Sequence, residues 1–442
     1  DRTDAARRDE WLRLSRGEAR VCVGPRSAVF APLKDIGLIV VDEEHEASYK
    51  HEGDPRYDAR SVAAKRAQDH GAVLVLGSAT PRPESIHHLI KMRLPERIDC
   101  RALPPVELLD MRGLNHPLHP QTRAALAELE RAGGKAIILL NRRGWSNFLS
   151  CRSCGRVWMC PNCEVALVLH RMGDAPGSVA CHHCGHHETS PSVCGACGSS
   201  TVARHGAGTE RIEHELREAI GNRDFPVLRL DADSVGLDRR ASTLELFSSA
   251  PAGLLIGTQM VAKGHDFADV TLGIVLDADQ TLRFPDFRAE ERTFSLITQL
   301  AGRVGRGDGG GRVLVQTLAP DARSIAFAAG HDADGFLAGE LRRREMLGYP
   351  PFSSLIRVVF SALVAADAQA AASALRERIA PPESDVLGPA PLFALRGRAR
   401  SQVVVKARAR AAAIEEIGQA VQSLARERRG SAVSVSVDVD PV

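Results

Sequence analysis

Eight of the ten cysteines in this chain lie in one short segment, and their spacing is the strongest constraint on how the chain folds. They form four CxxC pairs between Cys151 and Cys197, in the pattern C-x2-C-x5-C-x2-C-x17-C-x2-C-x9-C-x2-C. A CxxC pair folds into a tight turn that presents two thiolates, so four pairs can supply two tetrahedral four-thiolate zinc sites. Long cysteine-free stretches flank the segment, which is typical of a metal site in a reducing compartment and argues against a secreted disulfide framework.

The spacing alone leaves the pairing of the CxxC turns open. The two inner pairs are separated by a spacer of roughly the 15–20 residues expected of a zinc ribbon, which favours a nested arrangement over a sequential one. The nested arrangement gives one site of Cys151, Cys154, Cys194 and Cys197 and a second site of Cys160, Cys163, Cys181 and Cys184. Eight thiolates fill two closed sites, so we expect two structural Zn²⁺ ions, with the nearby histidines as bystanders.

Outside this segment, short apolar runs alternate with helical patterns up to about residue 320, which predicts parallel α/β sheets. Expected strands lie at 20–23, 37–42, 72–77, 135–141, 226–231, 253–258, 272–277 and 312–317, and expected helices at 57–70, 119–132, 208–220, 239–248 and 288–302. Unbroken apolar runs are typical of strands covered on both faces. From 354 onward the order is strand, helix, strand, strand, helix, strand, the split βαβ pattern.

Length and charge set wider limits. A chain of 442 residues suggests two to four domains at about 150 residues each. No apolar run approaches the ~18 residues of a membrane helix, so we expect no membrane partner. The net charge of +2 neither supports nor excludes a nucleic-acid partner, but nine basic and three acidic residues lie between 391 and 430. Arg396, Arg398 and Arg400 surround a glycine there and suit phosphate contacts, although a solvated basic face is the alternative.

Two short motifs follow expected strands in the first third of the chain. Asp42 and Glu43 directly follow the strand at 37–41, where phosphoryl transfer needs one carboxylate to hold Mg²⁺ and a neighbour to orient the attacking water. Ser78 and Thr80 lie in a Gly-Ser-Ala-Thr turn after the strand at 72–77. Such a turn can sense a neighbouring site, although turns rich in Ser and Gly are common.

Two further motifs lie near residues 260 and 300. The segment 257–267 places Thr258, Gln259 and Lys263 after a strand, and these donors suit contacts to phosphates. Arg303 and Arg306 are three residues apart near the end of a helix, so they share a face and can stabilise charge on a transferring phosphate. Surface arginines at a helix C-terminus are the plainer interpretation.

The order of these motifs is that of motifs II, III, V and VI of superfamily 2 helicases. More specifically, the chain resembles the PriA family of bacterial primosomal replication-restart helicases over nearly its whole length. The segments behind this resemblance are GPRSAVFAPLKDIGLIVVDEEHEASYKHEGDPRYDAR, LNRRGWSNFLSCRSCG, IGTQMVAKGHDFADVTLGIVLDAD, QLAGRVGRG and the terminal VDVDP. The resemblance also implies the nested zinc pairing.

The resemblance implies an α/β fold with two RecA-like helicase lobes, the first incomplete. They would span 1–115 and 116–330, with a zinc-ribbon-like insertion at 150–203 in the second lobe and a C-terminal α+β domain at 331–442. It implies catalytic roles for Asp42, Glu43, His45, Gln299, Arg303 and Arg306, coupling roles for Ser78, Thr80, Tyr49, Lys50 and Tyr57, and DNA contacts for Thr258, Gln259, Lys263, Arg396, Arg398 and Arg400. Tyr49 and Tyr57 lie in a segment that resembles the family's aromatic-rich loop, but the Trp that is often found in that loop is absent here.

The implied activity is ATP-dependent 3′→5′ DNA unwinding at stalled forks, with loading of the replicative helicase. Implied ligands and partners are Mg²⁺, ATP, forked and single-stranded DNA, primosome proteins and the single-stranded DNA-binding protein, for a cytoplasmic monomer. A P-loop, G-x-x-x-x-G-K-[ST], does not occur in the sequence. The resemblance places it before Asp1, so we expect a fragment that alone neither binds ATP tightly nor unwinds DNA.

Two other classes of protein compete with this interpretation. A non-enzymatic primosome scaffold would recognise forks through its zinc and C-terminal domains. Such a scaffold would have little reason to keep four helicase motifs. A general zinc-ribbon nucleic-acid module would explain the cysteines but not the helicase motifs.

Overall fold

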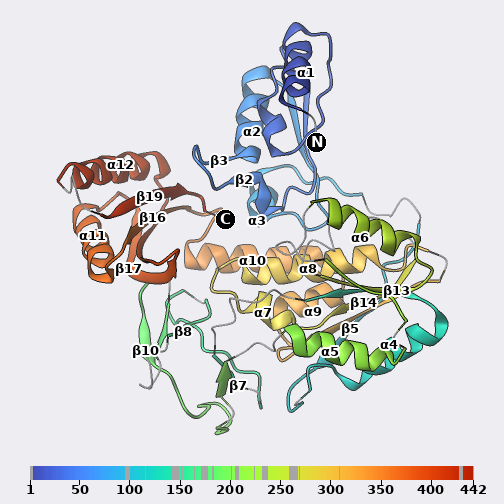
Figure 1. Ribbon diagram of the computed structural model, residues 1–442. Coiled ribbons are helices and arrows are strands. Elements are labelled where there is room, and N and C mark those ends of the chain that lie inside the picture. The colour runs from blue at the N-terminus through green and yellow to red at the C-terminus, as the bar shows by residue number, and fades with distance from the viewer. Residues whose placement is uncertain are drawn as a thin grey trace.

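A parallel six-stranded sheet forms the centre of the second lobe in the computed structural model of the chain (Figure 1). The structure describes residues 3–94, 100–114, 116–140, 149–151, 153–163, 165–170, 178–181, 184–200, 202–204, 209–222, 224–230, 237–257, 267, 269–307, 309–427 and 432–441. The strand order in this sheet is β12–β13–β6–β14–β15–β5. The strands are β5 (Val106–Asp110), β6 (Lys135–Leu139), β12 (Val227–Leu230), β13 (Gly253–Gly257), β14 (Val270–Val275) and β15 (Arg312–Thr317).

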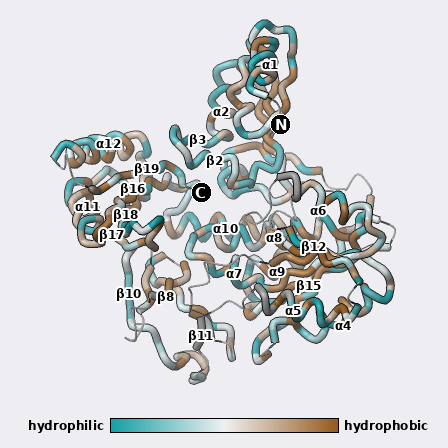
Figure 2. Tube along the Cα trace, viewed as in Figure 1, coloured by the Kyte–Doolittle hydropathy of each residue, from teal (hydrophilic) through white to brown (hydrophobic). Residues whose placement is uncertain are grey.

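Helices cover both faces of this sheet. Residues alternate along β6, so Ile137 and Leu139 enter one core cluster while Ala136 and Ile138 enter the other. One cluster includes α4 (Pro120–Ala132) and α5 (Thr209–Ile220), and the other includes α6 (Leu237–Ser249), α7 (Ala278–Leu282), α8 (Ala289–Arg303), α9 (Arg323–Ala329) and α10 (Ala333–Leu347). Figure 2 shows the strands of this sheet as the most hydrophobic part of the trace. The expected coverage on both faces is therefore confirmed for this lobe.

Two parts of the second lobe lie outside the range 116–330 expected for it. Strand β5 pairs with β15, although we placed its residues in the first lobe and did not expect a strand there. Helix α10 falls in the range assigned to the C-terminal domain, yet its Phe336 and Leu337 pack in the core of the second lobe. The packing unit therefore begins before residue 116 and runs past residue 330.

The first lobe contains a parallel pair of strands, β1 and β4, and three helices. Its elements are α1 (Asp4–Arg16), η1 (Arg26–Phe30), β1 (Leu38–Val41), η2 (Ala47–Tyr49), β2 (Lys50–His51), β3 (Tyr57–Asp58), α2 (Ala59–His70), β4 (Val73–Leu76) and α3 (Pro83–His88). Strand pairing is in register from Leu38 opposite Val73 to Val41 opposite Leu76.

Two sequence predictions for the first lobe are wrong. Leu38, Val40 and Val73 are each more than half exposed, so β1 and β4 are not covered on both faces among the described residues. The segment 20–23, expected as a strand, has no regular structure. Val21 and Val23 are 79% and 93% exposed, and this segment pairs with no strand among the residues that the structure describes.

The Cys-rich insertion, residues 149–204, is built from short strands. They are β7 (Leu149–Cys151), β8 (Val168–His170), β9 (Ser178–Ala180), β10 (His187–Thr189) and β11 (Val202–Arg204). β11 pairs with β7, and β10, β9 and β8 form an antiparallel three-stranded sheet. In Figure 1 the insertion lies below the C-terminal domain and beside the second lobe.

The C-terminal domain has the expected β-α-β-β-α-β order, in an antiparallel sheet of order β17–β18–β16–β19. Its elements are β16 (Ser354–Ala362), α11 (Ala365–Arg378), β17 (Ser384–Leu395), β18 (Arg398–Ala407), α12 (Arg410–Glu427) and β19 (Ser434–Val439). Apolar side chains from α11, α12 and the sheet form one core cluster. No helix in the described parts of the chain is long and apolar enough to span a membrane.

Candidate functional site

Asp42 and Glu43 lie at the carboxyl end of β1, next to the end of β4. The Gly77 N–H donates to the Val41 carbonyl (2.8 Å), and the Glu44 N–H donates to the Gly77 carbonyl (2.9 Å), so the two strand ends are joined. Glu43 has φ of +47°, a left-handed conformation that turns the chain sharply after Asp42. Asp42 is exposed and the Glu43 side chain is 46% exposed. Both carboxylates are therefore accessible oxygen ligands of the kind that hydrated Mg²⁺ takes.

His45 connects this turn to the Gly-Ser-Ala-Thr turn and to helix α8. Its Nδ1 lies 2.7 Å from Ser78 Oγ, and its Nε2 contacts Nε2 of Gln299. The Ser78 hydroxyl and the Gln299 amide therefore hold the two ring nitrogens of His45 from opposite sides, and Glu46 Oε1 lies 3.4 Å from the same Nε2. Glu43 Oε2 lies 3.5 Å from the same Nδ1.

A hydrogen bond between two hydroxyl groups also joins the lobes. The Thr80 N–H donates to Ser78 Oγ, and Thr80 Oγ1 lies 2.9 Å from Ser295 Oγ on α8. The Gln299 amide also donates to Ser295 Oγ at 2.9 Å. His45, Ser78, Thr80, Ser295 and Gln299 therefore form a closed ring of hydrogen bonds with three members on the first lobe and two on α8.

Arg303 follows Gln299 by one helical turn, so it lies on the face of α8 that carries this ring. Arg306 is just past the helix end, where its Nε donates to the Gly302 carbonyl at 2.9 Å and its own carbonyl accepts from Arg101 at 2.7 Å. A pocket beside the hydrogen-bonded ring is lined by Arg82 from the first lobe and Arg292 from α8, together with the carboxylates of Glu46 and Glu291.

Glu44 is a residue for which sequence reasoning assigned no role. Its side chain is fully buried and accepts hydrogen bonds from the Arg82 N–H (2.7 Å) and the Ser85 hydroxyl (2.9 Å). Its carbonyl accepts from the guanidinium of Arg60 at 2.6 Å. Glu44 therefore anchors the acidic turn to α3 and α2, whereas the Glu43 carboxylate stays accessible.

The segment expected to couple DNA binding to hydrolysis forms the short β2–β3 hairpin. The Tyr49 hydroxyl donates to the Asp42 carbonyl at 2.7 Å, and burial together with the Asp42 charge raises the pKa of Tyr49. Tyr57 packs edge-to-face on Phe30 with ring centroids 4.9 Å apart. Tyr49 thus contacts the acidic turn directly, whereas Tyr57 contacts η1.

Lys50, the third residue of this set, contacts the C-terminal domain. Its ammonium donates to the Val439 carbonyl at 2.5 Å and lies 3.2 Å from the Asp438 carboxylate. The guanidinium of Arg56 donates to the Val437 carbonyl at 2.5 Å. β19 is an edge strand, so two cations of the hairpin cap alternate carbonyls on its open edge.

Of the predicted DNA-contacting residues, the structure describes only the three arginines of the C-terminal domain. Thr258, Gln259 and Lys263 lie outside the described residues, directly after the end of β13. Arg398 donates to the carbonyls of Ser361 and Ala432, and Arg400 donates to the Phe393 carbonyl, so both guanidiniums bind backbone within the domain. Burial and the neighbouring Arg357 lower the pKa of Arg400. Only Arg396 of these three is exposed, in the turn between β17 and β18.

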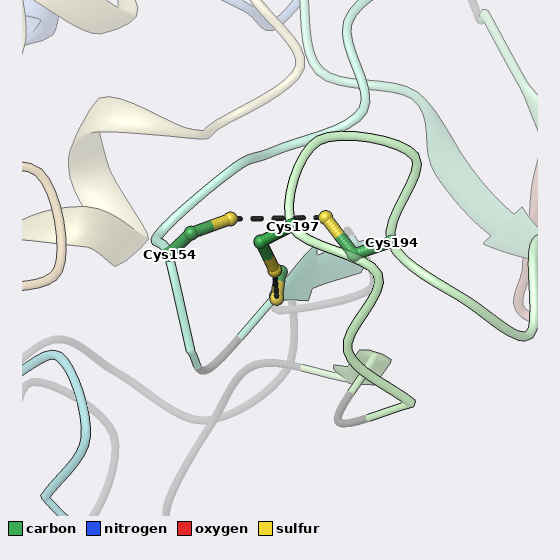
Figure 3. Close-up of side chains that lie close together, drawn as sticks. Cys154, Cys194 and Cys197 are labelled. Atoms are coloured by element: carbon green, nitrogen blue, oxygen red, sulfur yellow. Dashed lines mark hydrogen bonds between the residues drawn. The ribbon is translucent and has the colours of Figure 1, made fainter.

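The structure gathers the eight cysteines into the two nested groups. One group is Cys151, Cys154, Cys194 and Cys197, and the other is Cys160, Cys163, Cys181 and Cys184. Figure 3 shows Cys154 and Cys194 pointing toward each other from separate loops, with their sulfurs 3.7 Å apart. The Cys151–Cys197 and Cys160–Cys184 sulfurs are each 3.6 Å apart. A zinc tetrahedron with bonds of about 2.3 Å has edges of about 3.8 Å, so both groups fit a four-thiolate Zn²⁺ site.

The thiols of these groups ionise unequally. Burial opposes ionisation of Cys151, but the backbone N–H groups of Cys154 and Ser153 lower its pKa to about 6. The Ser199 N–H favours the Cys197 thiolate, but the neighbouring cysteines raise the pKa of Cys197 to about 12. Thiolates this close repel one another, and a divalent cation relieves that repulsion.

The zinc groups are part of a core shared with two other units. Cys160, Cys163 and Cys181 pack in one cluster with Phe287 of the second lobe and Tyr349, which precedes the C-terminal domain. The Tyr349 and Phe287 rings stack at 4.4 Å, and the Tyr349 hydroxyl donates to the Cys163 carbonyl at 3.3 Å. The insertion is therefore a structural element docked between lobe and C-terminal domain.

Three family profiles match consecutive parts of the chain. "Helicase conserved C-terminal domain" matches residues 205–308, "PriA DNA helicase Cys-rich region (CRR) domain" matches residues 160–188, and "Primosomal protein N C-terminal domain" matches residues 345–442. The first profile covers β12 to β14 and α8, and it places this part of the chain in the helicase class.

Curated relatives extend this similarity to nearly the whole chain. Replication restart protein PriA of Bacillus subtilis is 38% identical over 98% of this chain and 55% of its own length, and that of Synechocystis is 38% identical over 98% and 54%. Among solved structures, S. cerevisiae Dbp5 bound to RNA and ADP BeF3 has a TM-score of 0.36 and 15% identity, over 73% of this chain and 66% of that chain. The chain belongs to the PriA family, and it spans about half the length of these curated relatives.

Proposed function

We propose that this chain is the part of an ATP-dependent DNA helicase that carries the acidic turn, the coupling elements and the zinc module, and that the helicase acts in replication restart. The observation that carries the proposal is the closed ring from His45 through Ser78, Thr80 and Ser295 to Gln299. Hydrolysis at an interface between two lobes needs such a connection, because a change on one lobe must alter the other. A scaffold that only recognised forks would gain nothing from it.

The residues of the acidic turn, of α8 and of the hydrogen-bonded ring each have a role in this proposal. Asp42 would hold Mg²⁺, whose charge neutralises the phosphates of ATP, and Glu43 orients the attacking water. Arg303 at the end of α8 and Arg306 just after it reach the phosphates. His45 and Gln299 report the state of this site to the other lobe, and Ser78 and Thr80 carry the same signal.

The remaining predicted roles follow from position. Tyr49, Lys50 and Tyr57 couple DNA contact to the acidic turn, and Thr258, Gln259, Lys263 and Arg396 contact DNA. Arg398 and Arg400 shape the hairpin that presents Arg396. The two zinc groups hold the insertion in place without taking part in hydrolysis. Forked and single-stranded DNA, primosome proteins and the single-stranded DNA-binding protein are the proposed partners of a cytoplasmic monomer that unwinds 3′→5′.

The test is substitution of Glu43 by Gln in the full-length protein. Glu43→Gln should keep ATP binding, because Asp42 is unchanged, and should lower DNA-stimulated hydrolysis by roughly 10²-fold or more, since the water is no longer oriented. Glu52→Gln is the matched control, because Glu52 is an exposed glutamate on the nearby β2–β3 hairpin and its carbonyl, not its carboxylate, accepts from Arg56. Turnover by Glu43→Gln that equals the Glu52→Gln rate would refute the assignment. Hydrolysis at background in all three proteins would favour the scaffold.

A further inference from the structure

Arg344 is a fully buried arginine near the end of α10, and its guanidinium is surrounded by carboxylates from three helices. Its Nη1 lies 3.2 Å from Glu84 Oε1 on α3, its Nη2 lies 2.5 Å from Glu291 Oε2 on α8, and its Nε lies 2.8 Å from Glu340 Oε1 on α10. A single side chain therefore joins the first lobe, the second lobe and the helix that leads into the C-terminal domain.

The guanidinium also reaches the start of that domain. Its Nη1 donates to the Pro350 carbonyl at 3.2 Å, and its carbon lies 5.0 Å from the centre of the Phe287 ring. Phe287 stacks on Tyr349 in the core that holds the zinc groups. Arg344 thus contacts both lobes and the segment that leads into the C-terminal domain, and the stacked rings of Phe287 and Tyr349 connect it to the insertion.

Because these charged groups are buried, the stability of the cluster depends on each charge having a partner of opposite sign. Removing a buried charge from its partners is costly, because the partners that remain are left as uncompensated charges in a low-dielectric site. Burial alone would raise the pKa of Glu84, but Arg82 and Arg344 lower it to about 2. The Glu84 carboxylate is therefore charged, with Arg82 at 3.3 Å as its partner on the first lobe.

The two carboxylates lie on the elements that carry the ring of hydrogen bonds. Glu84 follows Thr80 by four residues, at the start of α3. Glu291 precedes Ser295 by one turn of α8. A cation that fixes Glu84 relative to Glu291 therefore also fixes Thr80 relative to Ser295.

We propose that Arg344 is a positioning residue that holds α3 of the first lobe against α8 of the second. It thereby sets the alignment in which Thr80 meets Ser295 and His45 meets Gln299. The guanidinium suits this role because its planar fork can bind several carboxylates at fixed angles, which an ammonium group cannot do. The effect on hydrolysis rests on the proposed function, but the effect on the lobe contact does not.

The first measurement needs no activity. Amide hydrogen exchange would be followed in the full-length protein and in Arg344→Gln, with Arg342→Gln as the control. Arg342 is exposed on the same helix and its Nε donates to the Ala338 carbonyl. In Arg344→Gln, residues 83–89 should exchange about tenfold faster or more, because α3 loses its contact with the second lobe, while β6 stays protected. Unchanged exchange of 83–89 in a folded Arg344→Gln protein would overturn the proposal.

A second variant covers the case in which Arg344→Gln does not fold. Glu84→Gln removes only the partner on the first lobe and leaves the ion pairs to Glu291 and Glu340 in place. It should give the same faster exchange at 83–89 with full protection of α8 and α10. If protection is lost evenly over both lobes, Arg344 has a general structural role only. If exchange at 83–89 is unchanged, Glu84 does not hold α3 against the second lobe and the proposal is wrong.

The second measurement is ATP hydrolysis. Arg344→Gln should lower the DNA-stimulated kcat about tenfold with less than about threefold change in KM for ATP, because the nucleotide contacts themselves are unchanged. Arg344→Lys should restore less than half of the lost rate, since an ammonium cannot bind three carboxylates at fixed angles. If the wild-type protein hydrolyses no ATP but Arg344→Gln still shows faster exchange in α3, the proposed function is wrong and the lobe contact is supported. A lower rate together with unchanged exchange would overturn the contact.

Discussion

The nested zinc sites predict how zinc content responds to single and double cysteine substitutions. Cys160→Ser removes one thiolate from the inner group, whose sulfurs lie about as far apart as a zinc tetrahedron requires. Structural zinc contributes apparent binding energies of about 10 kcal/mol or more to small loops, so a three-thiolate remnant should not retain the ion after dialysis against a chelator. The variant should then hold one Zn²⁺ per chain where the wild type holds two.

The double variants separate nested from sequential pairing. Cys160→Ser combined with Cys181→Ser should still retain one zinc, because both residues belong to the same group. Cys160→Ser combined with Cys151→Ser should retain none, because these residues belong to different groups. Elemental analysis of the dialysed proteins gives the count, and Cys100→Ser, an exposed cysteine outside both groups, is the control that keeps two. One retained zinc in the Cys151/Cys160 double variant would refute the nested pairing.

Loss of the inner zinc should also affect structure beyond the insertion. The inner cysteines share their core with Tyr349 and with Leu355 and Val404 of the C-terminal domain. We therefore expect faster amide exchange at the start of β16 in Cys160→Ser, while β6 of the second lobe stays protected. ATP hydrolysis should survive better than unwinding, because the acidic turn and α8 carry none of the ligands.

Two further predictions concern contacts between units. Thr80→Ala and Ser295→Ala, measured alone and together, should show a coupling free energy of about 1 kcal/mol in DNA-stimulated kcat, because both remove the same hydrogen bond. Additive effects would show that the two hydroxyls act separately. Lys50→Ala should loosen the β2–β3 hairpin from β19, seen as faster exchange at 50–58 and a lower DNA stimulation of hydrolysis, whereas Lys65→Ala, an exposed lysine of α2, should change neither.

Much of the framework was predictable from local pattern. The apolar runs that became β1, β4, β6 and β12 to β15 are short, continuous and followed by turn residues, so their positions follow from composition alone. Asp42, Glu43 and Ser78 could be singled out because each directly follows such a run. The C-terminal domain was predictable because its helices and strands differ clearly in period.

Contacts between distant residues could not be predicted in this way. His45 and Gln299 are separated by 254 positions, and nothing in either neighbourhood shows that they meet. Arg344 lies in a run of arginines near the end of a helix, where a solvent-exposed charge is the ordinary expectation. Its burial becomes visible only when α3, α8 and α10 are packed together.

One wrong prediction and one untested prediction depend on contacts of the same kind. Residues 20–23 read as a strand because they are apolar and β-branched, but a strand needs a partner edge, which the local sequence does not reveal. The DNA contacts of Arg398 and Arg400 stay a prediction, and a basic run gives no sign of the local contacts that their guanidiniums make. In the folded hairpin their guanidiniums donate to the backbone carbonyls of Ser361 and Phe393, and the sequence does not reveal these contacts.

The most direct test of the central claim is directional strand displacement by the full-length protein. Two partial duplexes that differ only in carrying a 3′ or a 5′ single-stranded tail would be incubated with and without ATP. An ATP-driven 3′→5′ helicase should release the strand from the 3′-tailed duplex only, and only with ATP, and Glu43→Gln should release neither while still binding both. Binding of forked DNA by the wild-type protein with no release of either strand in the presence of ATP would contradict the helicase assignment and leave the scaffold in its place.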